Sequence, residues 1–319
     1  MSADIGQRIQ DLYRQFGEIP GVTIEIHKSL VAVNILNDAA EATLFLQGAQ
    51  ISHFKSHHQP ASLWLSPECD YQAGKPLRGG IPICWPWFGQ LDKNPEEIKA
   101  QINNTQAPAH GFVRERDWQL DRIETLDPST TRVSLSLTIE ADAEPLWPFK
   151  CRIELDVIIA ESLNVTFRVF NLSGQTFHFS TALHSYFSVE HINQVAVTGL
   201  DQSQYLDCLN DWKNYNQIGK VTVDEEVDRL YFPTNNRLSI ENQKAGHCVH
   251  IESQNSNSTV LWNPWVNKAR RLSAFPDDAY QHMLCIETAN ADKDFVTLAA
   301  GQQHELRLTI SNQTAALNH

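Results

Sequence analysis

The fold class of this chain is indicated by one segment, Arg132-Val133-Ser134-Leu135-Ser136-Leu137-Thr138-Ile139. Polar and apolar side chains alternate along it, which is the pattern of a β-strand with one buried face. The same alternation recurs at 153–159, 163–169 and 306–310. Shorter candidate strands, bounded by turn signals, are expected at 22–27, 30–35, 42–46, 50–54, 194–198, 247–252, 258–262 and 283–288.

The candidate strands do not alternate with long helical patterns, so a doubly wound α/β fold is disfavoured. We expect an all-β fold, a large antiparallel β-sandwich. Ile5, Ile9, Leu12 and Phe16 have helical spacing and predict a short amphipathic N-terminal helix that ends before Gly17 or Pro20. The chain length suits one large all-β unit. We therefore expect a helical extension over 1–19 and a single β-sandwich domain over 20–319.

The composition is that of an ordinary soluble globular protein, with 42% hydrophobic and 20% charged residues. The formal net charge of −13 repels nucleic-acid backbones and anionic lipid heads, so neither is an expected partner. No export segment and no apolar run of ~20 residues is seen, which predicts a cytoplasmic protein. The six cysteines form no Cys-x-x-Cys pair and are expected to be reduced. We expect a monomer.

A candidate ligand site lies in the first third of the chain, in two blocks. The first runs Arg78-Gly79-Gly80-Ile81-Pro82-Ile83-Cys84-Trp85-Pro86-Trp87-Phe88-Gly89, and the second is His110-Gly111-Phe112 with Arg114. Glycine lets the backbone approach a ligand closely, proline stiffens the chain, and arginine binds anions through its fork of donors. An acidic protein needs such a local basic pocket to bind an anion. The two blocks predict a stiff pocket for a small, hydroxylated, anionic ligand.

Three further residues are candidates for chemistry, each with a plainer alternative. His184, in Ala182-Leu183-His184-Ser185-Tyr186-Phe187, is either a general acid or a strand histidine among aromatic neighbours. Glu287, which ends an apolar strand, is either a buried general base or an exposed edge-strand glutamate. Asp228 follows an acidic run and either holds sugar hydroxyls or lies in a solvated loop. Trp262-Asn263-Pro264-Trp265 either forms the floor of a sugar site or only packs.

Together these blocks resemble the glucose-6-phosphate 1-epimerase family, or hexose-6-phosphate mutarotases, within the aldose 1-epimerase (galactose mutarotase-like) superfamily. The resemblance covers about residues 20 to 311. The matching segments occur in the family's order: Gly48-Ala49-Gln50, Leu63-Trp64-Leu65-Ser66, Arg78-Gly79-Gly80-Ile81-Pro82, Trp85-Pro86-Trp87-Phe88-Gly89, His110-Gly111-Phe112-Val113-Arg114, Ala182-Leu183-His184-Ser185-Tyr186-Phe187, Val227-Asp228-Arg229, Trp262-Asn263-Pro264 and Ile286-Glu287-Thr288-Ala289.

The resemblance implies a large β-sandwich that binds a sugar phosphate and interconverts its α and β anomers without a metal or an organic cofactor. It implies a general acid at His184 and a general base at Glu287, acting on opposite sides of the sugar ring. It also implies that the sugar phosphate is bound by Arg78, His110, Arg114 and Asp228. Ala109 departs from the family pattern, because some relatives have a glutamine there that touches the substrate.

Three other functions remain open from the sequence. The first is a mutarotase of unphosphorylated aldoses, against which the arginine blocks argue. The second is a non-catalytic carbohydrate-binding protein, which has no need of an acid and a base. The third is a retaining glycosidase built on the carboxylates of Glu287 and Asp228.

Overall fold

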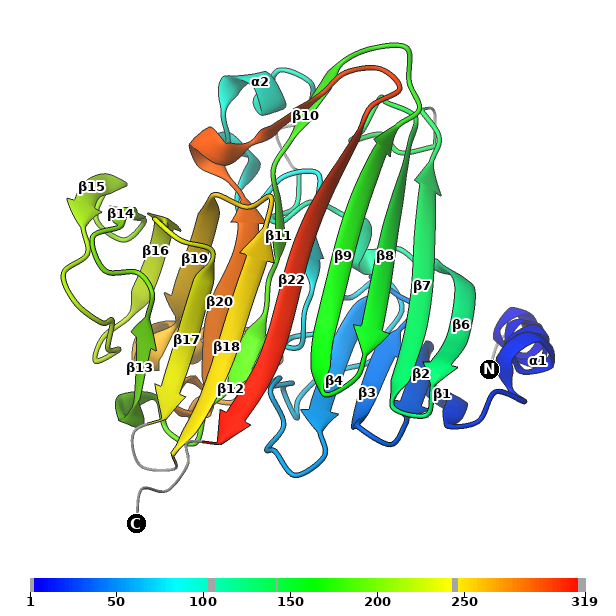
Figure 1. Ribbon diagram of the computed structural model, residues 1–319. Helices are drawn as coiled ribbons and strands as arrows, with labels where there is room; N and C mark the ends of the chain where they lie inside the picture. The colour runs from blue at the N-terminus through cyan, green and yellow to red at the C-terminus, as the bar shows by residue number, and fades with distance from the viewer. Residues whose placement is uncertain (1–2, 103–106, 142, 243–245, 315–319) are drawn as a thin grey trace.

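The computed structural model of this protein describes every residue except 1–2, 103–106, 142, 243–245 and 315–319. The described chain is mostly β-strand, and its paired strands are antiparallel (Figure 1). The expected all-β sandwich is therefore confirmed. One longer helix precedes the strands, α1 (Ala3–Phe16), which is the predicted N-terminal helix. Two short helices follow, α2 (Glu96–Lys99) and α3 (Trp265–Ala269).

One layer of the sandwich is an eight-stranded sheet, called here the long sheet. Its strands in spatial order are β13 (Val195–Thr198), β17 (Arg237–Asn242), β18 (His247–Gln254), β22 (Gln303–Thr314), β9 (Ser162–Asn171), β8 (Cys151–Ile159), β7 (Thr130–Ile139) and β6 (Gln119–Asp127). Figure 1 shows this sheet in front, running across the whole molecule.

Two sheets lie behind it (Figure 1). The site sheet, also eight-stranded, carries the candidate residues His184, Asp228 and Glu287 on or next to its strands. It contains β15 (Lys213–Asn216), β14 (Gln204–Asp207), β16 (Val227–Phe232), β19 (Ser258–Asn263), β20 (Met283–Asn290), β11 (Thr181–Leu183) and β5 (Ile83–Cys84), with β12 (Tyr186–Ser188) also on β20. The N-terminal sheet has β1 (Val22–His27), β2 (Leu30–Leu36), β3 (Ala40–Phe45) and β4 (Gln50–Ser56), and a separate pair joins β10 (Phe177–Phe179) to β21 (Val296–Leu298).

The register of the long sheet explains its alternating sequence. Leu135 on β7 lies opposite Leu155 on β8, which lies opposite Phe167 on β9. These side chains point into the main core, which the three sheets share with Leu12 and Phe16 of α1. Each apolar side chain thus has two apolar neighbours across the strands, which stabilises the sheet. The division of the chain at residue 19 stays a prediction.

The long alternating strands were predicted correctly, as were the shorter ones from 22–27 to 283–288. The strands that the sequence did not reveal are short or carry charges. They are β5, β6, β10, β11, β12, β14, β15, β16, β17 and β21. All six cysteines are free thiols, as expected. Within the described residues, no helix is long and apolar enough to span a membrane.

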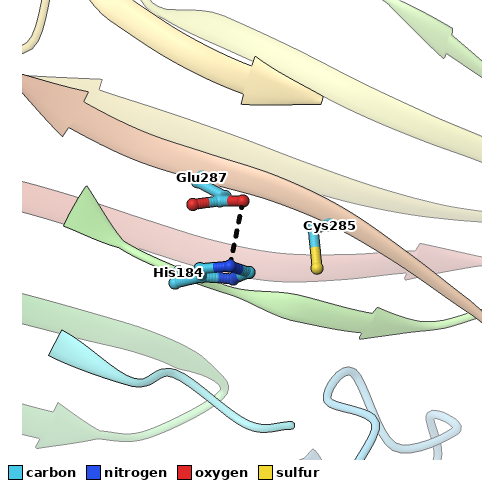
Figure 2. Close-up of side chains that lie close together, drawn as sticks. All are labelled: His184, Cys285 and Glu287. Carbon is cyan, nitrogen blue, oxygen red and sulfur yellow. Dashed lines mark ion pairs between the residues drawn. The ribbon is translucent and has the colours of Figure 1, made fainter. Parts of the chain in front are cut away.

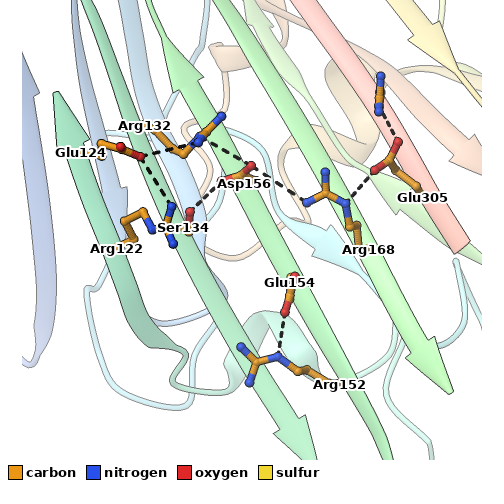
Figure 3. A network of polar contacts seen from close by, with 10 residues as sticks. Arg122, Glu124, Arg132, Ser134, Arg152, Glu154, Asp156, Arg168 and Glu305 are labelled. Atoms are coloured by element: carbon orange, nitrogen blue, oxygen red, sulfur yellow. Dashed lines mark hydrogen bonds and ion pairs between the residues drawn. The ribbon is translucent and has the colours of Figure 1, made fainter. Parts of the chain in front are cut away.

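The outer face of the long sheet carries a network of ion pairs (Figure 3). Asp156 on β8 lies 3.8 Å from Arg132 on β7 and 4.0 Å from Arg168 on β9. Arg168 also contacts Glu305 on β22 at 2.6 Å, and Glu305 contacts Arg307 at 2.5 Å. Opposite charges on neighbouring strands favour this register and cover the sheet with polar groups.

Glu305 offers a test of this network. Burial alone would raise the pKa of its carboxyl, but hydrogen bonds from Arg168 and Arg307 outweigh that effect and lower the pKa. A carboxyl whose pKa is lowered by folding stabilises the fold above its unfolded pKa and loses that contribution as the pH falls through its folded pKa. We expect Glu305→Gln to lower the free energy of unfolding by about 0.5–1 kcal/mol at neutral pH, and by less below about pH 4.

Urea denaturation at both pH values measures the difference. Glu225, an exposed glutamate with no ion pair among the described residues, gives the matched control Glu225→Gln. An equal loss of stability from Glu305→Gln at both pH values would contradict the role of its charge.

Candidate active site

Glu287 lies in the centre of the site sheet, on β20 between β19 and the pair β11 and β12. Side chains on β20 alternate between two covered faces. Leu284 and Ile286 pack into the main core, whereas Met283 and Cys285 belong to a second apolar cluster on the opposite face. Glu287 has the parity of this second face and is only 1% exposed. The alternative of an exposed edge-strand glutamate is therefore wrong.

His184 lies between β11 and β12, next to β20. Its backbone N–H donates to the carbonyl of Pro82 at 2.9 Å, and its ring stacks on Tyr186 at 4.8 Å between centroids. These contacts orient the imidazole so that Nε2 lies 3.3 Å from Oε1 of Glu287, as Figure 2 shows. The two groups are in contact, and no space wide enough for a sugar ring lies between them. The expectation that they act on opposite sides of the ring is therefore wrong.

Burial controls the protonation of this pair. It raises the pKa of the Glu287 carboxyl well above its usual value, and the negative charge of Asp228 adds to this effect. Burial also lowers the pKa of His184 well below its usual value, with further contributions from His110 and Arg114. Burial thus favours the neutral form of each group, and the protonation of one is coupled to that of the other. Among the described residues, Nδ1 of His184 and Oε2 of Glu287 have no hydrogen-bond partner.

His110 is held beside His184, with 5.4 Å between ring centroids. Its backbone has a positive φ of 67°, and its N–H donates to the carbonyl of Gly89 at 2.8 Å. The N–H of Gly89 in turn donates to Nδ1 of His110 at 3.3 Å. Burial, with the charges of Arg114 and Arg78, lowers the pKa of His110 to about 3. A neutral ring whose Nδ1 accepts a hydrogen bond carries its proton on Nε2, so His110 is a donor.

Gly111 makes this placement of His110 possible. Its φ is +68°, and a Cβ there would lie 1.9 Å from the carbonyl oxygen of Trp85. Only glycine fits such a close approach at this backbone angle. The contact brings the segment that contains His110 against the segment that contains Trp85. The sequence predicted that these two segments line one pocket.

Arg78 and Arg114 have no carboxylate within ion-pair distance among the described residues. Arg114 donates through Nη2 to the carbonyl of Ala109 at 2.8 Å, and its buried Nε has no partner. Arg78 donates through Nη2 to the carbonyl of Ser273 at a long 3.4 Å, and it also interacts with the hydroxyl of Tyr186. By contrast, Arg116, two residues beyond Arg114, pairs with Glu144. The charges of the two arginines remain available to an anionic ligand.

Asp228 lies on β16, not in a solvated loop, so that alternative is wrong. One of its oxygens is 3.7 Å from Nζ of Lys268 on α3, and Lys268 also pairs with Glu226. Burial raises the pKa of the Asp228 carboxyl despite the opposing effect of Lys268. The carboxyl faces the same cavity as Glu287 and can accept hydrogen bonds from ligand hydroxyls.

Two adjoining cavities bring the predicted residues together. The first, of about 430 Å³, is lined by Asp228 and Glu287, together with Trp262 on β19. The second, of about 710 Å³, is lined by Arg114. Both cavities share a wall that contains Arg78, Ala109, His110, His184 and Tyr186. A cavity of several hundred Å³ has the size of a small-molecule site, and the many charged and polar residues in these two linings suit a polar ligand.

Three residues of this site were not predicted from the sequence. Lys268 and Trp212 line the first cavity, and Trp212 lies at the turn of the β14–β15 hairpin with a positive φ of 57°. Cys285 places its Sγ close to the His184–Glu287 pair: the three ligand atoms lie within 4.8 Å of one another. The spacing Cys285-Ile286-Glu287 could have revealed it, because residues two apart on a strand share a face. This trio is the group of described residues that could hold a metal ion.

The solved structures that resemble this chain have the same architecture. The Salmonella typhimurium protein described as a "putative mutarotase (YeaD)" matches with a TM-score of 0.83 at 24% identity, over 93% of this chain and 95% of its own. A "galactose mutarotase-like protein" from Clostridium acetobutylicum matches with a TM-score of 0.71 at 14% identity, over 92% and 98% of the two chains. The fold is that of the galactose mutarotase-like proteins.

The sequence comparisons are more specific. The pattern of the family described as "Aldose 1-epimerase" matches residues 32–311. A Cenchrus ciliaris protein named "Putative glucose-6-phosphate 1-epimerase" is 31% identical over 85% of this chain and 80% of its own. An Escherichia coli K12 protein of the same name is 28% identical over 79% and 81%. This chain belongs to the aldose 1-epimerase family and is an epimerase, which confirms the resemblance seen in its motifs.

Trp212 offers a test of the first cavity. Its side chain lines the cavity, and aromatic faces pack well on sugar rings. We expect Trp212→Ala to raise KM for the sugar roughly fivefold, equivalent to about 1 kcal/mol, with a smaller change in kcat. Tyr215, an exposed aromatic residue on the same hairpin that does not line this cavity, gives the control Tyr215→Ala. Equal effects of the two variants would remove Trp212 from the site.

Proposed function

We propose that this epimerase interconverts the α and β anomers of hexose 6-phosphates, with glucose 6-phosphate as the reference substrate. The proposal rests on the contact of 3.3 Å between Glu287 and His184. Both residues line the first cavity, and His184 also lines the second cavity, where the two arginines lie. Those arginines are without carboxylate partners among the described residues. The printed names of the Cenchrus ciliaris and Escherichia coli relatives support the same substrate.

The chemistry needs one proton removed and one added. Ring opening takes a proton from the C1 hydroxyl and gives one to the ring oxygen. Both oxygens are bonded to C1, so a base and an acid that touch each other can reach both. Glu287 takes the C1 hydroxyl proton, and protonated His184 gives its proton to the ring oxygen. This avoids a full charge on either oxygen.

Reclosure uses the same two groups with their roles reversed. After the ring opens, the C1–C2 bond rotates and presents the other face of the aldehyde. His184 then takes the proton of the C5 hydroxyl while Glu287 returns its proton to the carbonyl oxygen. The pair ends in its starting state, with one proton between its members. Burial stores that proton on Glu287, and the 3.3 Å contact lets it pass to His184 before ring opening.

The phosphate is assigned to the second cavity. Arg78 lines both cavities and Arg114 lines the second, so a sugar in the first cavity can extend its phosphate toward both arginines. Phosphate and arginine form charge-assisted, often two-point hydrogen bonds. His110, a neutral donor on the shared wall, and Asp228, an acceptor in the first cavity, suit the sugar hydroxyls.

The decisive experiment is NMR exchange between the anomers of glucose 6-phosphate, with and without the protein. Faster exchange with the protein than in buffer is expected. The same measurement on glucose tests the alternative of an unphosphorylated substrate. Exchange of glucose at an equal or higher kcat/KM would overturn the phosphate assignment and leave the epimerase assignment intact.

His184 and Glu287 are tested by His184→Gln and Glu287→Gln. Each variant is expected to lower kcat by about 10²–10⁴-fold, because one partner in proton transfer is removed. Binding of glucose 6-phosphate, measured by calorimetry, is expected to change only slightly. His282→Gln, at an exposed histidine, and Glu225→Gln are the matched controls. Unchanged kcat in either site variant would remove that residue from the mechanism.

Arg78 and Arg114 are tested by Arg78→Ala and Arg114→Ala. Charge-assisted hydrogen bonds contribute about 1.5–3 kcal/mol, so each variant is expected to lower kcat/KM for glucose 6-phosphate roughly 10- to 100-fold. The loss for glucose is expected to be smaller. Arg271→Ala, at an exposed arginine that lines neither cavity, is the control. Equal losses for both substrates would contradict phosphate binding by these arginines.

A further inference from the structure

The catalytic pair has a third polar neighbour that the proposed reaction does not use. Cys285 lies two residues before Glu287 on β20, on the same face of the strand. Its Sγ, a ring nitrogen of His184 and a carboxylate oxygen of Glu287 all lie within 4.8 Å of one another. In Figure 2 the three side chains converge from β20 and from the connection between β11 and β12.

These groups have unused binding capacity. The exposed fractions of His184, Cys285 and Glu287 are 8%, 0% and 1%. Oε2 of Glu287 has no hydrogen-bond partner among the described residues, although it is buried. A buried carboxylate oxygen without a partner costs free energy, so a cation that reached it would be bound favourably.

The donor set selects a particular class of ion. Imidazole nitrogen, thiolate sulfur and carboxylate oxygen are the three ligand types of Zn²⁺ in proteins. Mg²⁺ and Ca²⁺ prefer oxygen ligands only. Three protein ligands leave the fourth tetrahedral position open, here toward the first cavity, which His184 and Glu287 line.

We propose that His184, Cys285 and Glu287 form an inhibitory site for Zn²⁺ and similar thiophilic divalent ions. Nε2 of His184, Sγ of Cys285 and the carboxylate of Glu287 bind the ion, which enters through the first cavity. The thiol proton and the proton shared by the pair leave to solvent, because all three ligands bind in their deprotonated forms. The bound ion occupies the groups that must exchange protons with the sugar, so metal and substrate exclude each other.

The surrounding charges limit the strength of this site. Arg114 and Arg78 disfavour positive charge at His184, and Asp228 disfavours the negative charge that Glu287 carries as a ligand. A chelator is therefore expected to reverse the inhibition. Bound phosphate at the arginines would not restore activity, because the ion holds the carboxylate of Glu287.

The first test measures inhibition and rests on the proposed function. Anomer exchange of glucose 6-phosphate is measured with added Zn²⁺, with Mg²⁺ and after addition of a chelator. We expect reversible inhibition by Zn²⁺, competitive with the sugar, and none by Mg²⁺. Loss of a residue that only supports a metal ligand lowers metal affinity about 10- to 100-fold. Cys285→Ala removes a ligand itself, so it should weaken Zn²⁺ inhibition at least as much.

Two other cysteines provide matched controls. Cys208 lines the first cavity, and Cys248 lies 3.8 Å from Nδ1 of His250. Cys208→Ala and Cys248→Ala should leave Zn²⁺ inhibition unchanged. If one of these removes the inhibition and Cys285→Ala does not, the ion binds elsewhere and the proposal is wrong.

The second test does not depend on any activity. Co²⁺ bound to a thiolate has a sulfur-to-metal charge-transfer band in the near ultraviolet, which titration of the intact protein would reveal. The band is expected in the wild-type protein and in Cys208→Ala, and it should be lost in Cys285→Ser. Absence of the band from the wild type, or its persistence in Cys285→Ser, would overturn the site. A protein that binds Co²⁺ through Cys285 but does not act on glucose 6-phosphate would instead overturn the proposed function alone.

Discussion

The active site depends on the burial of one carboxyl, that of Glu287, on a strand whose two faces are both covered. An ionised carboxylate is poorly solvated there, so it requires a proton or a cationic neighbour. His184 is the neighbour within reach, and the same burial disfavours its charged form. Neither group can therefore ionise independently without a cost in free energy. Transfer of a proton from one to the other costs less free energy, and the mechanism proposed above uses such a transfer at every turnover.

Because β20 is covered on both faces, the two faces of the site sheet have different roles. On one face, Leu284 and Ile286 belong to the main core and fix β20 against the long sheet. On the other, Cys285 and Glu287 meet the segments that carry Arg78 and His110. The outer arginines of the long sheet, such as Arg168, are paired with carboxylates (Figure 3). The cavity residues Arg78 and Arg114 have no such partner among the described residues. Two arginines without a carboxylate partner thus lie where an anionic ligand can neutralise them.

Much of this could be predicted from the sequence, and the failures have physical causes. The period-two segments fix a strand and its buried face locally, so 132–139 and its partners were predictable. β16 was not, because its burial depends on neighbours far away in the chain, and Asp228 therefore resembled a loop residue. The contact of His184 with Glu287 depends on the pairing of β12 with β20, which no local pattern encodes. Trp212 reaches the cavity only through a hairpin with two left-handed residues.

The charge balance of the long sheet has a consequence for how substrate arrives. In the ion-pair network on its outer face, the five arginines 122, 132, 152, 168 and 307 are matched by the five acids 121, 124, 154, 156 and 305, so this network adds nothing to the net charge of −13. An approaching anion first meets a repulsive field and feels the cavity cations only at close range. Dissolved ions screen that field beyond about 8 Å at physiological strength. The association rate constant of an anionic sugar should therefore rise with ionic strength. This is the reverse of the usual behaviour of an enzyme that attracts its substrate electrostatically.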